Sequence, residues 1–100
     1  EQPDLSFVTL SEEAERRAAQ VADKLRQEGH YVEIDLMDRS LKAQMKFANK
    51  QGARYSLVIG EVELTSGRAV LHPMGEGTDL ELEWQDSAAL SAALAGRGGH

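Results

Sequence analysis

The stretch Tyr55-Ser56-Leu57-Val58-Ile59-Gly60 decides the fold of this chain. Leu57, Val58 and Ile59 follow one another without the polar alternation of a half-exposed strand. A short continuous apolar run between turn-forming residues is typical of a strand that is buried on both faces. The sequence therefore predicts a central strand at residues 55–60, and we interpret the segments around it relative to this strand.

Two strand-and-helix units precede the central strand. Residues 5–10 form an apolar run that predicts a first strand, and a helix is expected between Ser11, which can cap it, and Gly29, which can end it. Residues 31–37 alternate between apolar and acidic side chains, which is typical of an edge strand with one solvated face. A second helix is expected over residues 40–51. The apolar stripe of the first helix consists of Ala14, Ala18, Val21, Ala22 and Leu25.

A hairpin and a last helix follow the central strand. Residues 68–74 and 78–84 are the expected arms of the hairpin around residues 75–77, and the final helix begins near Asp86. Two consecutive β-α-β units require right-handed crossovers and parallel strands. We therefore predict an α/β fold, with a mixed five-stranded sheet in the order 2-1-3-4-5, its first three strands parallel, and three helices distributed over both faces.

The composition fits one globular domain. The chain has 100 residues, of which 41% are hydrophobic and 28% charged, and this balance argues against global disorder. It has no cysteine, which excludes disulfides, thiolate catalysis and Cys-based zinc sites. We expect a single domain over residues 1–100, ordered over about 5–95 with a flexible tail at 96–100. Because the first residue is Glu1 and not methionine, we expect a piece of a longer protein.

The charges are distributed unevenly along the chain. The net charge is −6, which by itself disfavours nucleic-acid binding. Residues 39–54, however, contain five basic side chains and no acidic one. Lys42, Lys46 and Lys50 are four residues apart, so a helix would stack them on one face, and Arg39 would enter from the same side. This basic face is either a solvated helix surface or a site for an anion.

Two glutamates follow the central strand at the edge where ligands bind in open α/β sheets. Glu61 and Glu63 fall in a predicted loop that begins at Gly60. A carboxylate can accept two hydrogen bonds from the N1–H and N2–H groups of guanine, and unstacked bases are read on such edges. The two residues are therefore either base-reading side chains or solvated acids of a loop.

The sequence contains no catalytic or metal-binding pattern. His30, His72 and His100 lack the spacing of metal ligands. The first strand is not followed by the glycine-rich loop that dinucleotides and phosphates require. Ser11 has no histidine partner that would make it a nucleophile. We expect no catalytic residue, no metal and no cofactor in this domain.

The second predicted helix and the central strand carry a recognisable motif. It reads Arg39-Ser40-Leu41-Lys42-Ala43-Gln44-Met45-Lys46-Phe47-Ala48-Asn49-Lys50-Gln51-Gly52-Ala53-Arg54-Tyr55, followed by Val58-Ile59-Gly60-Glu61 and Glu63-Leu64. This pattern resembles the C-terminal anticodon-binding domain of histidyl-tRNA synthetases, which are class II aminoacyl-tRNA synthetases. The resemblance extends from about residue 6 to residue 94.

The resemblance implies a function and a site. Such a domain binds the anticodon stem-loop of a tRNA as the accessory domain of a cytoplasmic histidine–tRNA ligase, which is usually a homodimer. A separate catalytic domain of the same chain activates histidine with ATP and Mg²⁺. The histidine anticodon contains two guanines, which gives the two glutamates a role. The implied RNA-binding residues are Arg39, Ser40, Lys42, Lys46, Lys50, Glu61 and Glu63.

Two other interpretations remain open at this point. A synthetase-like paralogue without aminoacylation could use the domain for regulation. Alternatively, the acidic surfaces could make the chain a protein-interaction domain that binds a basic partner. The basic face favours an RNA-binding domain or its regulatory relative, whereas the net charge of −6 favours the protein-interaction domain.

Overall fold

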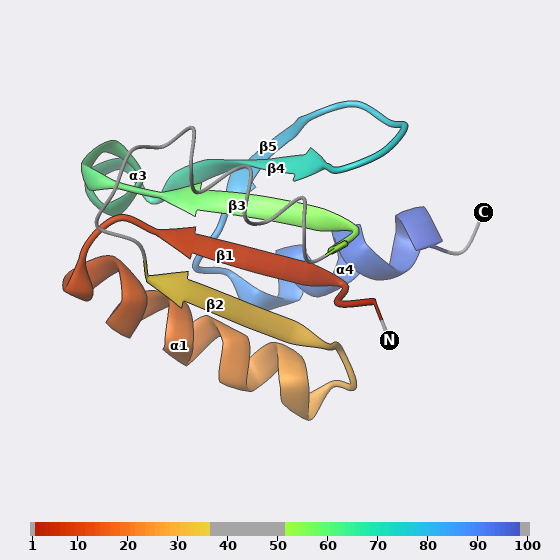
Figure 1. The fold of residues 1–100 in the computed structure, drawn as a ribbon, viewed down its shortest axis with the longest axis horizontal. Coiled ribbons are helices and arrows are strands. Elements are labelled where there is room, and N and C mark those ends of the chain that lie inside the picture. Colours follow the sequence, from red (N-terminus) through yellow and green to blue (C-terminus); the bar gives the residue numbers. More distant parts are fainter. Residues whose placement is uncertain (1, 37–51, 99–100) are drawn as a thin grey trace.

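The structure is a computed structural model, and it describes residues 2–36 and 52–98. Five strands and three helices are found in these residues (Figure 1). In chain order they are β1 (Leu5–Thr9), α1 (Glu12–Gln27), β2 (Val32–Leu36), β3 (Tyr55–Ile59), α3 (Glu61–Ser66), β4 (Arg68–Pro73), β5 (Leu80–Glu83) and α4 (Ser87–Gly98). The second helix expected from the sequence, at residues 40–51, lies outside the described residues.

The strands form one mixed sheet in the order β2-β1-β3-β4-β5. β1 pairs in parallel with both β2 and β3, whereas β4 is antiparallel to β3 and to β5. Leu57 lies in the middle of β3, opposite Phe7 of β1, and both side chains are fully buried. The predicted sheet order, the three parallel strands and the interior position of the apolar run are confirmed.

Helix α1 is built as its sequence predicts. The Ser11 side chain accepts a hydrogen bond from the amide of Ala14 at 3.1 Å, which satisfies one of the free N–H groups at the start of the helix. All five residues of the predicted apolar stripe are buried. The chain leaves the helix through Gly29, whose φ of +96° is a conformation that glycine adopts without a steric cost. Burial of one helix face against the sheet therefore follows from the spacing of the apolar residues.

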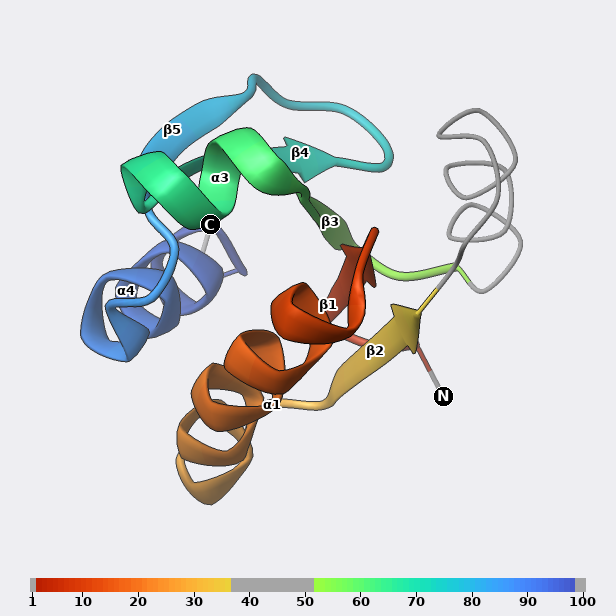
Figure 2. The ribbon, with the colours of Figure 1, turned by 90° about the vertical axis from the view of Figure 1, so that its left-hand side faces the viewer.

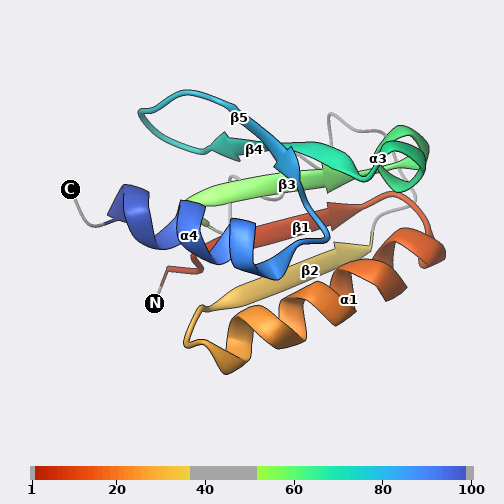
Figure 3. The same ribbon diagram turned by 180° about the vertical axis from the view of Figure 1, so that it is seen from behind.

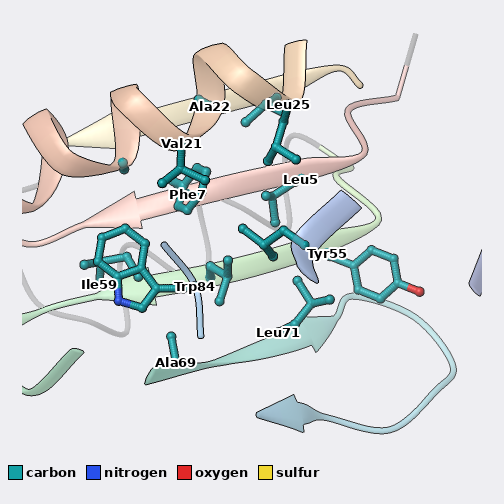
Figure 4. Packing of buried hydrophobic residues seen from close by; sticks show 14 of the residues in the cluster. Leu5, Phe7, Val21, Ala22, Leu25, Tyr55, Ile59, Ala69, Leu71 and Trp84 are labelled. Carbon is teal, nitrogen blue, oxygen red and sulfur yellow. The ribbon is translucent and has the colours of Figure 1, made fainter. Parts of the chain in front are cut away.

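The hydrophobic core lies between the sheet and the two long helices, α1 and α4, which cover the same face (Figures 2 and 3). Phe7 of β1 and Trp84, which follows β5, meet edge to face with their ring centroids 6.3 Å apart (Figure 4). Such a pair contributes about 0.5–1.5 kcal/mol beyond the area that it buries. Trp84 is fully buried and links the end of the hairpin to the central strands.

Two segments differ from the sequence prediction. The residues after β3 were expected to form a loop, but they form helix α3, which starts directly after Gly60 and is followed by Gly67 with φ +76°. Helix α4 runs to Gly98, so residues 96–98, expected in a flexible tail, are helical. The short helix α3 lies at the end of the sheet to which β1, β2 and β3 point, and it therefore belongs to the candidate site (Figure 1).

The burial of β3 predicts the effect of a core substitution. Leu57→Ala should lower the free energy of unfolding by about 2–5 kcal/mol, because it removes a fully buried side chain and leaves a cavity. Val62→Ala is the control, since this side chain on α3 is 72% exposed and its truncation should change stability by less than about 0.5 kcal/mol. Urea unfolding followed by circular dichroism measures both, and equal effects would contradict the assignment of the core.

Candidate nucleic-acid interface

The three parallel strands end together at one edge of the sheet, which we call the carboxyl edge. Thr9 of β1 pairs in register with Leu36 of β2 and with Ile59 of β3, and each of these residues is the last of its strand. The amide of Leu10 donates to the carbonyl of Ile59 at 3.0 Å, so the pairing continues one residue past the end of β1. Chain segments that leave these strands are therefore held close together, as a ligand site in an open α/β sheet requires.

Glu61 is the first residue of α3 at this edge, and its side chain is exposed. Among the described residues, its carboxylate makes no ion pair and no hydrogen bond. Within the described residues, both carboxylate oxygens are therefore available directly after the end of β3. This is the arrangement that a carboxylate needs in order to accept hydrogen bonds from an incoming base.

Glu63 occupies a different environment from Glu61. Its Oε1 accepts a hydrogen bond from the amide of Gly60 at 2.9 Å, and its backbone carbonyl accepts one from the indole Nε1 of Trp84 at 3.0 Å. In a helix, side chains two positions apart are separated by about 200° around the helix axis. The two glutamates thus do not share one face, as they would on an extended strand.

An apolar surface adjoins the carboxyl edge at the ends of β1 and β2. Leu10 and Leu36 are 38% and 39% exposed, and together with Ser11 and Glu12 they line a hollow of about 290 Å³. Exposed leucine side chains and a nearby carboxylate can contact the face and the edge of a base, respectively. Sequence reasoning missed Leu10 and Leu36 because an isolated leucine at the end of a strand gives no motif.

The residues of the basic face cannot be placed from the structure. Arg39, Lys42, Lys46 and Lys50 lie outside the described residues, and so does Ser40. The last member of the basic segment, Arg54, is described and has a structural contact. Its Nη1 lies 3.0 Å from Asp4 Oδ1, and its guanidinium lies 5.8 Å from the centre of the Tyr55 ring. Arg54 immediately precedes β3, at the opposite edge of the sheet from α3.

Asp35 lies near the carboxyl edge, and its surroundings raise the pKa of its carboxyl group. It is half-buried near the end of β2, and its carbonyl accepts a hydrogen bond from the Thr9 hydroxyl at 3.0 Å. Burial, followed by the charge of Glu33, raises the pKa of its carboxyl group above the ordinary value of 3.8, and the Ser6 hydroxyl offsets part of this rise. The strand face expected to be solvated is thus only partly solvated, and Asp35 is held there at a cost to stability.

The described part of the chain offers no metal centre. No group of three or more His, Asp or Glu side chains in residues 2–36 and 52–98 could hold a metal ion. His30 Nε2 is 2.9 Å from the Ser91 hydroxyl, and His72 Nδ1 is 2.7 Å from Asp79 Oδ1. These contacts give both histidines a structural environment away from the carboxyl edge. Within the same residues, no helix combines the length and the apolar character needed to cross a bilayer.

The sequence and the fold correspond to a known class of domain. A family profile described as "Anticodon binding domain" matches residues 4–90. The match covers most of the chain, which therefore belongs to the anticodon-binding domain family.

Within the family, this chain is similar to histidine–tRNA ligases. It is 44% identical over 80 residues to a histidine–tRNA ligase of Acetivibrio thermocellus and 48% identical over 82 residues to one of Caldanaerobacter subterraneus. These matches cover 80% and 82% of this chain but 19% and 20% of the relatives, so the chain spans about a fifth of the length of the curated relatives it matches. The crystal structure of apo S. aureus histidyl-tRNA synthetase has a TM-score of 0.79 and 32% identity, over 94% of this chain and 27% of that one.

These similarities confirm the resemblance to histidyl-tRNA synthetases that the motif at residues 39–64 indicates. They do not favour the protein-interaction domain or the regulatory paralogue. The roles of the individual site residues stay predictions.

The raised pKa of Asp35 predicts a pH-dependent gain in stability from Asp35→Asn. A group whose pKa is raised by folding stabilises the fold fully below its unfolded pKa and loses that contribution as the pH rises through the folded value. The neutral asparagine should therefore make the protein more stable than the wild type at pH 7, and this advantage should vanish below about pH 3.8.

Urea unfolding at pH 7 and at about pH 3.5 measures this difference. Asp23→Asn is the matched control, because its side chain is 69% exposed and its pairing with Arg26, at 3.5 Å, is worth little. A loss of stability at pH 7 in Asp35→Asn would show that the charged carboxylate has a favourable partner.

Proposed function

We propose that this chain recognises the anticodon of a tRNA as the accessory domain of a histidine–tRNA ligase. The observation that supports this most strongly is the exposed carboxylate of Glu61, which has no partner in residues 2–36 and 52–98, at the carboxyl edge of an anticodon-binding fold. The similarity to histidine–tRNA ligases supports the choice of tRNA. An anticodon that contains guanines offers paired N–H donors, which a carboxylate is suited to accept.

The remainder of the proposed activity belongs to other parts of a longer protein. Because the chain spans about a fifth of the curated relatives, we assign histidine activation, with its ATP and Mg²⁺, to a catalytic domain of the same longer chain. The residues of this chain need neither group for binding the anticodon. A cytoplasmic homodimer is part of the same proposal.

Two kinds of contact would contribute to tRNA binding, one to affinity and the other to specificity. The basic side chains of Arg39, Lys42, Lys46 and Lys50, with the hydroxyl of Ser40, would contact phosphates and supply affinity that depends on salt. Glu61 would read a base and supply specificity, since backbone contacts alone carry no sequence information. This division explains how an acidic chain of net charge −6 can bind an anion.

Base reading by Glu61 predicts a loss of discrimination in Glu61→Gln. The substitution keeps the size of the side chain but replaces one acceptor oxygen with an N–H donor, so a bidentate guanine contact fails. The preference for the histidine anticodon stem-loop over a guanine-to-adenine variant should fall by about 1–3 kcal/mol, on the scale of bidentate base contacts. Most of the affinity should remain.

Titration of the two stem-loops with wild type and variant measures the ratio of affinities. Glu76→Gln is the matched control, because it makes the same change at an exposed acid in the loop between β4 and β5, at the other end of the sheet from α3. An unchanged ratio in Glu61→Gln would identify Glu61 as a solvated acid.

Phosphate binding by the basic face predicts a change in salt dependence. Lys42→Ala with Lys46→Ala should weaken tRNA binding at low salt and reduce the slope of log affinity against log salt by about one unit for each lost contact. The control, Arg16→Ala with Lys24→Ala, removes the same charge from the exposed surface of α1. If both double variants change the slope equally, the effect comes from net charge and the basic face is not a binding site.

A further inference from the structure

Helix α3 carries the candidate base reader but cannot be stable by itself. It has six residues, none of which is buried. Isolated helices of fewer than about 12–15 residues are only marginally stable in water, because the first hydrogen-bonded turn is costly to form. Leu64 packs against the core only as a partly buried side chain. The position of α3, and of Glu61 at its start, must therefore depend on specific contacts.

The Glu63 carboxylate closes the first turn of α3. Its Oε1 accepts the amide hydrogen of Gly60 at 2.9 Å, while the carbonyl of Gly60 accepts from the amide of Leu64 at 2.9 Å. Glu63 is the third residue of the helix, which is the position from which a glutamate can reach back to the residue before the helix. This bond joins Gly60, which precedes Glu61, to Glu63, which follows it. It therefore fixes the junction between β3 and α3 at the position of Glu61.

The Glu63 carbonyl joins the same helix to the core. It accepts the indole Nε1–H of Trp84 at 3.0 Å and the amide of Gly67 at 2.9 Å. The amide of Trp84 in turn donates to the carbonyl of Gly67 at 3.2 Å. Because Trp84 is fully buried and packs against Phe7, these bonds tie the end of α3 to the hydrophobic core.

We infer that Glu63 is a positioning residue, which holds α3 so that Glu61 faces the anticodon, and that it does not itself read a base. A bidentate contact with guanine needs both oxygens of a carboxylate aimed at the base, and the bond from the Gly60 amide to one oxygen of Glu63 turns this carboxylate toward its own backbone. Glu61 has both oxygens free of described partners. This inference rests on the proposed function for its effect on tRNA, whereas the positioning contact itself can be tested without RNA.

The experiment compares Glu63→Gln with Glu63→Ala. The amide oxygen of glutamine can still accept the Gly60 hydrogen, whereas alanine cannot, although alanine is the better helix former. Glu76→Ala is the matched control, because it removes one exposed acid from the loop between β4 and β5, at the other end of the sheet. All variants are made in the full 100-residue chain.

The first measurement is hydrogen exchange of the α3 amides without RNA. In Glu63→Ala, the amides of Leu64 and Gly67 should exchange roughly 2- to 30-fold faster, which is the factor expected when a helix cap is lost. They should be nearly unchanged in Glu63→Gln and in Glu76→Ala. The amide of Met74, which donates to Arg54 at 3.0 Å at the far edge, serves as the internal reference. Unchanged exchange in Glu63→Ala would overturn the inference.

The second measurement is the ratio of affinities for the histidine anticodon stem-loop and its guanine-to-adenine variant. Glu63→Ala should lose discrimination between the two stem-loops. Glu63→Gln should retain it, because the amide oxygen of glutamine can still accept the hydrogen bond from Gly60 that positions α3. Loss of discrimination in Glu63→Gln with protected α3 amides would show that Glu63 touches the base, and would overturn the inference. If the wild type itself shows no discrimination, the proposed function fails, and the exchange rates alone decide whether Glu63 positions α3.

Discussion

The parallel pairing of β1 with both of its neighbours is the constraint on which the rest of the structure depends. Parallel strands cannot be joined by tight turns, so each connection must cross the sheet and return to its starting edge. The strand ends at Thr9, Leu36 and Ile59 are consequently in register. Every segment that leaves these strands starts at the carboxyl edge, and this places α3 beside the hollow at Leu10.

The main elements could be predicted because their signals are local. The stripe of α1 repeats over twelve residues from Ala14 to Leu25, and Ser11 marks where the helix starts. Helix α3 could not be predicted in this way, since six residues give too short a period to recognise. Its contact with the core is made by Trp84, twenty-one residues from Glu63 in the chain, and no pattern of neighbouring residues reveals that contact.

In the candidate site, too, local sequence patterns do not reveal the contacts of single residues. Glu61 and Glu63 are equivalent in the sequence, as two acids separated by one valine after a buried strand. The structure distinguishes them, because within the described part of the chain the side chain of Glu63 accepts a hydrogen bond and that of Glu61 does not. Arg54 also belongs to the basic segment in sequence, but its partner Asp4 lies fifty residues away. Charge and spacing therefore indicate a candidate binding region, whereas tertiary contacts decide which of its side chains are available.

The placement of Trp84 has a spectroscopic consequence. It is the only tryptophan of the chain, it is fully buried, and its indole N–H is bonded to the backbone of α3. The emission of an indole depends on the polarity around it and on its hydrogen bond. The single tryptophan thus lies beneath the segment proposed to meet the anticodon, and selective excitation of its indole can follow movement of α3 in the unlabelled protein.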